Sequence, residues 1–307
     1  MKFLKNFMIL NKKKLLVTHD GSFHADDVFA TAVLSILNKG KVKIIRTRDE
    51  KIIAKGDYVY DVGGIYDPET NRFDHHQIGG AGKRENGIEY SSFGLVWKKF
   101  GEEVCGSRKA AEIIDNKLVV PIDADDNGID LVEKKYKVFP YLVQDVLSVF
   151  KPSPLENMDV DKQFLKALEW AKEILNREIK KTNDQIQITE IIKNFYQNSK
   201  DKRLVVIDAP RVLRYDIWDA LQDFPEPIFI VYNSSDEWRI VAMRSDYNSF
   251  GNRKKLPSTW SGLRDVEFQK VSRVPDATFC HRGLFLAGAK SKEGAIKLAE
   301  LALLSQN

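Results

Sequence analysis

The chain is poor in cysteine, and it lacks both long apolar runs and a strong excess of charge. Its two cysteines, Cys105 and Cys280, lie far apart and form no CxxC pair, which argues against a structural thiolate zinc site and favours a reduced compartment. Its apolar stretches fall short of the roughly 18 residues that cross a bilayer. We therefore expect a cytoplasmic protein. Residues 1–10 could be part of a mitochondrial transit peptide, but they lack arginine and serine, which favours a simple surface tail.

The formal net charge is only +4, and the lysines between Lys2 and Lys14 are numerous enough to supply all of it. The body of the chain is therefore near neutral, unlike a protein that coats nucleic acid over its whole surface. An anionic substrate must be bound by local groups, and the weak overall charge favours a short substrate.

Length and composition indicate a globular protein of two domains. The chain has 307 residues, of which 43% are hydrophobic and 30% are charged. The alternation of apolar strands with helices in the first half predicts an α/β fold, with a mostly parallel sheet and helices on both faces. Strands are expected at 14–18, 42–47 and 57–62, a hairpin at 65–73, and helices at 23–38, 91–100 and 108–117.

The second half predicts a smaller α+β domain behind a helical connector. Residues 159–198 have helical spacing and almost no glycine or proline, which predicts one or two long helices. Strands are then expected at 204–207, 228–232 and 239–244, followed by turn-rich chain and a last helix at 293–304. The expected parts are a basic tail (1–13), a metal-binding catalytic domain (14–155), a helical connector (156–200) and a substrate-binding domain (201–307).

Histidine is scarce as well, and four of the five histidines lie in two short runs, 19–27 and 73–77. His19 follows the first expected strand, Asp61 ends the third, and the Asp-His-His run at 74–76 closes the hairpin. The carboxyl ends of parallel strands meet at one edge of a sheet, where ligands gather, so these side chains are expected to lie together. Imidazole and carboxylate concentrated at one edge predict a metal site.

Two further aspartates, Asp123 and Asp126, follow the apolar run 118–120 and are expected at the same edge. If this segment is helical, the two side chains share one face and both could approach a metal; if it is extended, only one could. Asp20 and Asp27 lie at the start of an expected helix, and we interpret them as helix-start charges rather than ligands.

Imidazole and carboxylate without sulfur suit Mn²⁺, Mg²⁺ or Fe²⁺, and a catalytic Zn²⁺ is also compatible with them. The supply of ligands exceeds the needs of one ion, which predicts two ions with Asp61 between them. Two such ions can lower the pKa of a shared water and hold both oxygens of an in-line phosphoryl displacement. The candidate ligands are His19, His24, Asp26, Asp61, Asp74, His75 and one of Asp123 and Asp126.

Several motifs give the chain a resemblance to a known family from about residue 14 to its C-terminus. It resembles the DHH phosphoesterase superfamily and, within it, most closely the melanocyte-proliferating-gene (Myg) family of 3′–5′ exonucleases. The motifs are His-Asp-Gly-Ser-Phe-His-Ala-Asp (19–26), Asp-Val-Gly-Gly-Ile-Tyr-Asp-Pro (61–68), Arg-Phe-Asp-His-His-Gln (72–77), Ile-Asp-Ala-Asp-Asp-Asn-Gly (122–128), Leu-Pro-Ser-Thr-Trp-Ser-Gly-Leu-Arg (256–264) and Phe-Cys-His-Arg-Gly-Leu-Phe-Leu-Ala-Gly-Ala-Lys (279–290).

The resemblance implies roles for individual residues. His76 would face the scissile phosphate as a hydrogen-bond donor or general acid, and Asp74 would orient a neighbouring imidazole. His24 stands where the wider superfamily usually has aspartate, so its role is the least defined. The implied metal ligands are His19, His24, Asp26, Asp61, His75 and one of Asp123 and Asp126.

The resemblance also places substrate binding in the C-terminal half. Superfamily members often end with a glycine-rich loop and a histidine that hold phosphate, and residues 281 and 287–290 occupy that place. Alanine at 287 and 289 departs from the pattern, which shifts the expected phosphate contacts to basic side chains. Trp260 is interpreted as a core residue, with base stacking as the alternative. The expected substrate contacts are Arg253, Arg264, His281 and Lys290.

The leading hypothesis is a metal-dependent phosphodiesterase with two Mn²⁺ or Mg²⁺ ions, a 3′–5′ exonuclease that acts on single-stranded RNA or DNA. Its polarity rests on the resemblance. A second hypothesis is hydrolysis of a short oligonucleotide, a cyclic dinucleotide or pyrophosphate. A third is a non-catalytic nucleic-acid-binding protein, against which the intact ligand set argues. An oligomer is compatible with the sequence.

Overall fold

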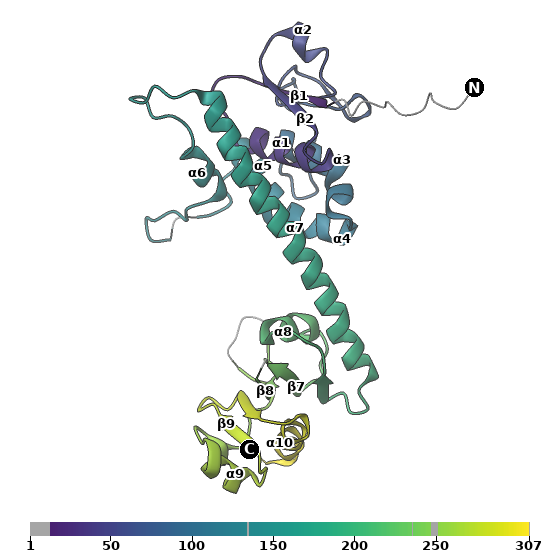
Figure 1. The fold of residues 1–307 in the computed structure, drawn as a ribbon, viewed down its shortest axis with the longest axis vertical. Coiled ribbons are helices and arrows are strands. Elements are labelled where there is room, and N and C mark those ends of the chain that lie inside the picture. Colours follow the sequence, from purple (N-terminus) through teal and green to yellow (C-terminus); the bar gives the residue numbers. More distant parts are fainter. Residues whose placement is uncertain (1–12, 134, 235, 247–250, 307) are drawn as a thin grey trace, which may run out of the picture. The chain divides into compact units, whose positions relative to one another are not determined.

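The structure, a computed structural model, describes residues 13–133, 135–234, 236–246 and 251–306. The chain forms two compact units, the first ending at Asn183 and the second beginning at Asp184 (Figure 1). This boundary falls inside the long helix α7 (Val160–Asn198). The segment 159–198, for which one or two long helices were predicted, therefore forms one helix. The predicted basic tail lies almost entirely outside the described residues.

The first unit contains a five-stranded sheet in the order β2-β1-β3-β5-β4. β1, β2, β3 and β5 are mutually parallel, and β4 pairs antiparallel with β5. The last two strands form the expected hairpin, closed by a 3₁₀ turn at Pro68–Thr70. The strands are β1 (Lys14–Thr18), β2 (Val42–Arg46), β3 (Tyr58–Tyr60), β4 (Tyr66–Asp67) and β5 (Arg72–Phe73).

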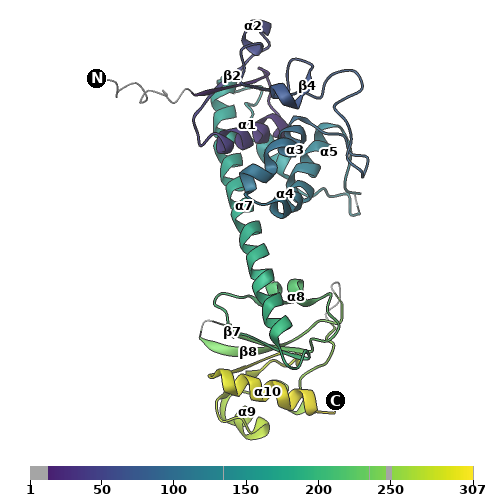
Figure 2. The same cartoon turned by 90° about the vertical axis from the view of Figure 1, so that its right-hand side faces the viewer.

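Helices lie on both faces of this sheet, as predicted. On one face Tyr60 makes a 2.6 Å hydroxyl–hydroxyl hydrogen bond to Thr31 of α1 (Ala25–Leu37), and the ring of Phe73 packs 5.8 Å from that of Phe100 in α3 (Ser92–Cys105). α1 and α3 lie side by side beneath the strands in Figure 2. On the other face, the side chains of Val17 and Val59 lie against Gly56, in the turn that follows the one-turn helix α2 (Glu50–Ile53).

The segment before Asp123 and Asp126 is helical, so the apolar run 118–120 is not the end of a strand. α4 (Arg108–Ile114) continues through a π-helical turn (Asp115–Val119) into α5 (Val120–Asp126). The buried residues of this stretch recur at helical spacing, which explains why an apolar run of three did not form a strand. α6 (Val143–Ser148) follows after a long irregular segment.

The second unit contains another five-stranded sheet, in the order β6-β7-β8-β10-β9, in which only β6 and β7 pair in parallel. The expected strands and last helix are present as β6 (Leu204–Ile207), β7 (Phe229–Ser234), β8 (Glu237–Ala242) and α10 (Lys292–Leu304). The expectation of turn-rich chain between β8 and α10 was wrong in part. That stretch also forms α9 (Asp265–Ser272), β9 (Ala277–Cys280) and β10 (Leu286–Ala289).

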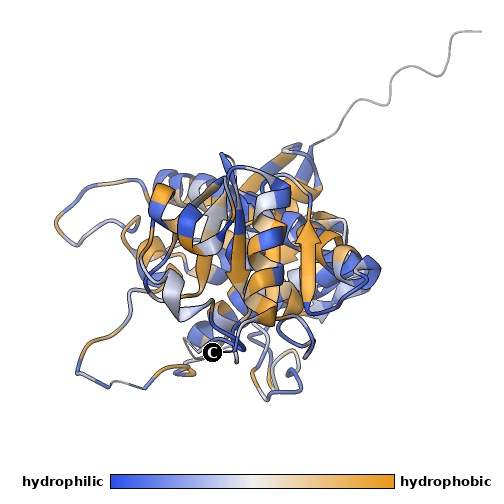
Figure 3. Ribbon diagram, turned by 90° about the horizontal axis from the view of Figure 1, so that it is seen from below, coloured by the Kyte–Doolittle hydropathy of each residue, from blue (hydrophilic) through white to orange (hydrophobic). Residues whose placement is uncertain are grey.

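Alternating residues of β7 supply two hydrophobic cores, one on each face of this second sheet. Phe229 and Val231 belong to a cluster with residues of α9 and α10. Ile230 and Tyr232 belong to another cluster, with the end of α7 and with α8 (Arg214–Leu221). Hydrophobic residues, orange in Figure 3, are concentrated in the strands and helices. The unit is therefore an α+β layered structure, as predicted.

Candidate metal centre

The carboxyl ends of β1, β3 and β5 bring three of the predicted segments to one edge of the first sheet. The N-terminus of α1 and the C-terminus of α5 add further acidic and imidazole groups at the same place. Three groups of candidate ligand atoms result, and within each group the atoms lie within 4.8 Å of one another. The groups are Asp61 with Asp74, His75 and His76; His19 with His24 and Asp61; and His24 with Asp26 and Asp126.

Asp61 belongs to two of these groups. Its Oδ2 lies 3.1 Å from His19 Nε2, and its Oδ1 lies 3.5 Å from His76 Nδ1. Oδ1 is buried and has no hydrogen-bond partner among the described residues. The backbone of Asp61 has φ +56°, a left-handed conformation that aspartate adopts more readily than most residues. This turn, directly after β3, directs the carboxylate toward imidazoles from two other strands.

His19 is held in a defined tautomer. Its Nδ1 lies 2.8 Å from the carbonyl oxygen of Asp20, which can only accept, so Nδ1 carries the proton. Nε2 faces two carboxylate oxygens, Asp61 Oδ2 and, at 3.3 Å, Asp27 Oδ2. In the protonated ring Nε2 donates to Asp61, and in the neutral ring Nε2 is the nitrogen that could coordinate a metal. Burial works to lower the pKa of His19, but the hydrogen bond with Asp61 and the charge of Asp27 outweigh it and raise this pKa.

Asp26 gives the clearest indication of a cation. The side chain is fully buried, and neither carboxylate oxygen meets a hydrogen-bond donor among the described residues. Burial first, and then the charges of Asp61 and Asp126, raise the pKa of Asp26 well above its ordinary value. A buried carboxylate without donors is costly unless a cation neutralises it. The donor set of imidazole and carboxylate fits Mn²⁺ or Mg²⁺.

Asp27 and Asp20 have different roles, although both were interpreted as helix-start charges. Asp27 lies in the first turn of α1, as expected, and its Oδ1 accepts a 2.9 Å hydrogen bond from the amide of His24, the N-cap of this helix. Its other oxygen faces His19, a contact that the sequence did not indicate. Asp20 lies four residues before this N-cap, so its interpretation as a helix-start charge was wrong; it is exposed and forms an ion pair with Arg48.

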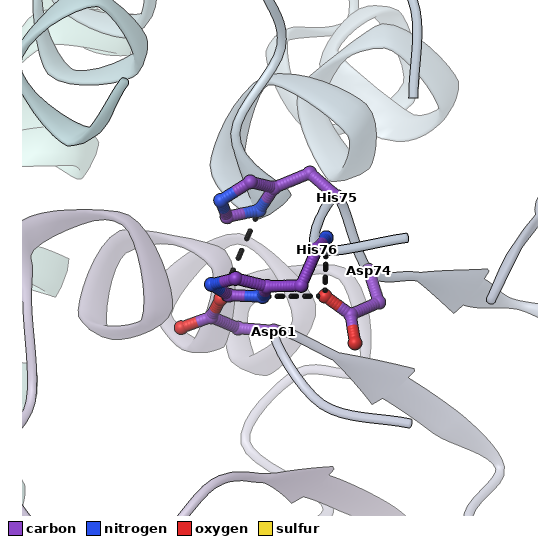
Figure 4. A group of neighbouring side chains, drawn as sticks. All are labelled: Asp61, Asp74, His75 and His76. Atoms are coloured by element: carbon purple, nitrogen blue, oxygen red, sulfur yellow. Dashed lines mark hydrogen bonds and ion pairs between the residues drawn. The ribbon is translucent and has the colours of Figure 1, made fainter. Parts of the chain in front are cut away.

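Asp74 and His76 form a coupled pair beside this cluster (Figure 4). Asp74 Oδ1 accepts hydrogen bonds from His76 Nδ1 at 2.8 Å and from the His76 amide at 3.1 Å, while Oδ2 accepts one from the Gly64 amide at 2.6 Å. Burial works to raise the pKa of Asp74, but these hydrogen bonds outweigh it and hold the pKa at about 2. The carboxylate in turn raises the pKa of His76. The predicted partner of Asp74 is therefore His76.

His75 turns toward a different carboxylate. Its Nε2 lies 3.0 Å from Asp126 Oδ2, and its Nδ1 lies 3.2 Å from the hydroxyl of Ser92. Burial works to raise the pKa of Asp126, but the hydrogen bond with His75 outweighs it, so that this pKa is lowered. His76, by contrast, is 61% exposed in its side chain and faces solvent.

Asp123 does not approach the cluster, although α5 is helical, so only Asp126 remains of the two candidates. Asp123 is fully buried and accepts hydrogen bonds from the hydroxyl of Ser91 and the amide of Gly94, at 2.6 and 3.0 Å. The guanidinium of Arg84 completes its surroundings. Residues three apart on a helix differ by about 60° around the axis, which is enough to turn Asp123 toward α3 and Asp126 toward the cluster.

Two cavities flank the cluster and share His24, Asp61 and His76. The first, which we call the main cavity, measures about 650 Å³ and includes Lys151 in its wall. The second measures about 550 Å³ and includes Arg48. Neither cation was predicted as a site residue. Arg48 follows β2, so the same strand-end rule could have found it, whereas no sequence signal marked Lys151.

The substrate contacts predicted in the C-terminal half differ in their surroundings: one is held by backbone carbonyls and the other three are exposed. Arg253 has a structural role, because its guanidinium donates hydrogen bonds to the backbone carbonyls of residues 222, 224, 227 and 244. It is therefore not retained as a phosphate contact. Trp260 is 4% exposed and packs in the core, which confirms the core interpretation. Arg264, His281 and Lys290 are not buried and stay predictions. Residues 287–289 belong to strand β10 rather than to a loop.

Comparison with known proteins agrees with these motifs. Residues 15–303 match the family model MYG1_exonuc, described as an uncharacterised protein family (UPF0160). The chain is 31% identical over 291 residues to a MYG1 protein of Chlamydia pneumoniae, covering 93% of this chain and 95% of the relative. It is 27% identical over 337 residues to the MYG1 exonuclease of Homo sapiens, covering 94% and 86%.

The chain belongs to the MYG1 family. The predicted resemblance is thereby confirmed, and so is the broad enzyme class, a metal-dependent hydrolase. Among solved structures, the chain is similar to RecJ of Thermus thermophilus in complex with Mn²⁺, with a TM-score of 0.28 and 13% identity, covering 96% of this chain and 53% of RecJ. In the described part of the chain, no helix is both long and apolar enough to span a membrane.

Proposed function

We propose that this member of the MYG1 family is a 3′–5′ exonuclease that removes nucleotides from single-stranded RNA or DNA with the help of two Mn²⁺ or Mg²⁺ ions. The observation that carries the proposal is the position of Asp61 between two groups of candidate ligands, beside the buried and donor-free carboxylate of Asp26. The human relative is named an exonuclease, and the polarity rests on the family resemblance.

Six residues would hold the ions, with Asp61 shared between them. Bound ions would neutralise the buried carboxylates, draw the phosphate into the main cavity and make an attacking water more acidic. Without them, the acidic groups at this edge would repel a phosphodiester. The six are His19, His24, Asp26, Asp61, His75 and Asp126.

The imidazole of His76 would supply a proton to the leaving oxygen. Asp74 keeps the proton on Nδ1 by accepting its hydrogen bond, so the remaining ring nitrogen faces the open side of the cluster. The pKa of His76 is raised by this carboxylate, which keeps the imidazolium available near neutral pH. Lys151 and Arg48, one in each flanking cavity, would bind non-bridging phosphate oxygens.

A second candidate function is hydrolysis of short substrates, such as a dinucleotide, a cyclic dinucleotide or pyrophosphate. The main cavity favours it, because a volume of about 650 Å³ with a single lysine suits a compact ligand. A long strand would gain little from the near-neutral chain, whose formal net charge is +4.

The test is hydrolysis in Mn²⁺ of 5′-labelled single-stranded RNA and DNA, of dinucleotides and of pyrophosphate. Ladders that shorten from the 3′ end support the exonuclease, whereas turnover of the small substrates alone supports the second candidate. The Asp61→Ala variant should lose more than about 100-fold in activity, because loss of a residue that only hydrogen-bonds to a metal ligand already costs about 10- to 100-fold. Glu102→Ala, at an exposed site on α3, is the matched control. No turnover by the wild-type protein would refute both.

A further inference from the structure

The segment 19–24, which connects β1 to α1, carries two of the six candidate metal ligands, His19 and His24. It belongs to no helix or strand, so its course depends on contacts with other elements. Arg46, the last residue of β2, makes one of these contacts: its Nη2 donates a 2.7 Å hydrogen bond to the carbonyl oxygen of Gly21. Gly21 has φ +83°, a left-handed conformation that favours glycine.

The register of the sheet explains why Arg46 reaches this segment. β1 and β2 are parallel, and Thr18, the last residue of β1, pairs with Arg46. The chain that leaves β1 therefore starts beside Arg46. Arg48, two residues further along, donates a 2.7 Å hydrogen bond to the preceding carbonyl, that of Asp20. The same Asp20 oxygen lies 2.8 Å from His19 Nδ1.

The guanidinium of Arg46 is fixed by further contacts. Its side chain is only 3% exposed. It lies against the rings of Phe164 in α7 and of Phe23, at 4.7 and 5.7 Å from their centroids. Its Nη1 donates a 2.6 Å hydrogen bond to Asp161 Oδ1 in the first turn of α7. These contacts hold in place the planar group that binds the Gly21 carbonyl.

Stability alone does not explain a buried arginine at this position. Its Nε is buried and has no hydrogen-bond partner among the described residues, which costs free energy. A buried ion pair can often be replaced by apolar residues of similar volume without loss of stability. The side chain of Asp161 is 65% exposed, so water would solvate it in the absence of Arg46. An apolar residue could not, however, replace the hydrogen bond to Gly21.

We propose that Arg46 is a positioning residue of the metal centre: by holding the Gly21 carbonyl, it fixes the segment 19–24 in the course that brings His19 and His24 together. This inference rests on the metal centre of the proposed function, and it adds a residue outside the ligand set on which metal affinity depends. A segment whose course is already fixed loses less freedom when its side chains bind an ion, so the ion binds more tightly.

The test is calorimetric titration of the metal-free wild-type protein and of Arg46→Met with Mn²⁺. Methionine keeps an unbranched apolar side chain against the two rings but cannot donate a hydrogen bond. The charge of Arg46 acts on Asp27, which faces His19, so its removal should by itself tighten the binding of a cation. The positioning role predicts the opposite, a Kd for Mn²⁺ that is about tenfold or more higher. The Tm of the metal-free variant should stay close to that of the wild-type protein.

Arg84→Met is the matched control, because Arg84 is another buried arginine, and its partner Asp123 does not approach the cluster. This control should lower the Tm and leave the Kd for Mn²⁺ unchanged. If Arg46→Met does not fold, Arg46→Lys takes its place. Lysine keeps the charge but lacks the planar fork that reaches both Gly21 and Asp161, so its Kd for Mn²⁺ should also exceed that of the wild-type protein.

An unchanged or lower Kd in the Arg46 variant would overturn this inference and leave the proposed function intact. Equal increases of the Kd in Arg46→Met and Arg84→Met would also overturn it, because the effect would then follow from lost stability. If the wild-type protein binds Mn²⁺ but hydrolyses neither oligonucleotides nor pyrophosphate, the proposed function fails, and the Kd values still decide the role of Arg46. A wild-type protein that binds no Mn²⁺ would refute both.

Discussion

Asp74 accepts two hydrogen bonds from His76, one from the imidazole Nδ1 at 2.8 Å and one from the backbone amide at 3.1 Å. The pair comes from neighbouring residues of one motif, so a single turn after β5 both places and polarises the histidine. Asp74 is buried, whereas the side chain of His76 is 61% exposed. The histidine can therefore exchange its proton with solvent while the carboxylate that holds it stays out of contact with water.

Asp74→Asn should lower kcat by roughly 10–100-fold, because the imidazole loses the carboxylate that fixes its tautomer and raises its pKa. An acid with a raised pKa stays protonated to higher pH, so the variant should lose activity at lower pH than the wild-type protein on the alkaline side. The measurement is kcat against pH in Mn²⁺, with Asp67→Asn, at the last residue of β4 and away from the candidate ligands, as control. An unmoved alkaline limb would show that His76 is not the acid.

The metal-free protein should lose stability as pH rises from about 4 to about 7. Burial first, and then the charge of Asp61, raise the pKa of the fully buried Asp27 to about 7. A carboxyl with a higher pKa in the folded than in the unfolded state binds its proton more tightly when folded, so ionisation favours unfolding. For Asp27 alone the loss is at most on the order of 4 kcal/mol.

Thermal unfolding in EDTA across this pH range checks the trend, and Asp27→Asn, which keeps an oxygen for the helix cap, should flatten it. Mn²⁺ should oppose the loss, because its ligands must be ionised to bind. At 100 times its Kd, the ion should add about 2.7 kcal/mol to the free energy of unfolding. A Tm of the metal-free protein that is constant from pH 4 to 7 would contradict this account.

Arg84→Met should lower the free energy of unfolding by about 3–5 kcal/mol, since it leaves the buried carboxylate of Asp123 without its cation. The double variant Arg84→Met/Asp123→Asn should recover part of the loss. Urea unfolding measures both. Arg108→Ala is the matched control: that side chain is 80% exposed, and its ion pair with Glu112 should be worth less than about 1 kcal/mol. Equal effects at the two arginines would disprove a structural role specific to Arg84.

Lys151→Ala should raise KM by about tenfold with a smaller change in kcat, because a hydrogen bond to a charged group contributes roughly 1.5–3 kcal/mol. The effect should weaken at high salt, which screens the phosphate contact. Steady-state kinetics at two ionic strengths provides the measurement, with Lys166→Ala on the exposed face of α7 as control. An unchanged KM would remove Lys151 from the substrate site.

Local rules accounted for much of the site. Strand patterns placed His19, Asp61 and the Asp-His-His run after β1, β3 and β5, and the edge rule for parallel sheets brought them together. The same rule applied to β2 would have found Arg48. These positions could be predicted because short apolar runs mark the strands, and the residue that follows each run lies at the carboxyl end of its strand.

The sequence also determined the family and the residue types that a metal would meet. It could not choose between Asp123 and Asp126, because both lie on one helix and only the packing of α5 against α3 turns the first toward Arg84. Nor could it find the carbonyls of distant residues to which Arg253 donates, or the place of Lys151 in the wall of the main cavity. Which groups meet across the fold depends on tertiary packing, because a side chain's partners are set by contacts between elements and not by its own neighbours in the chain.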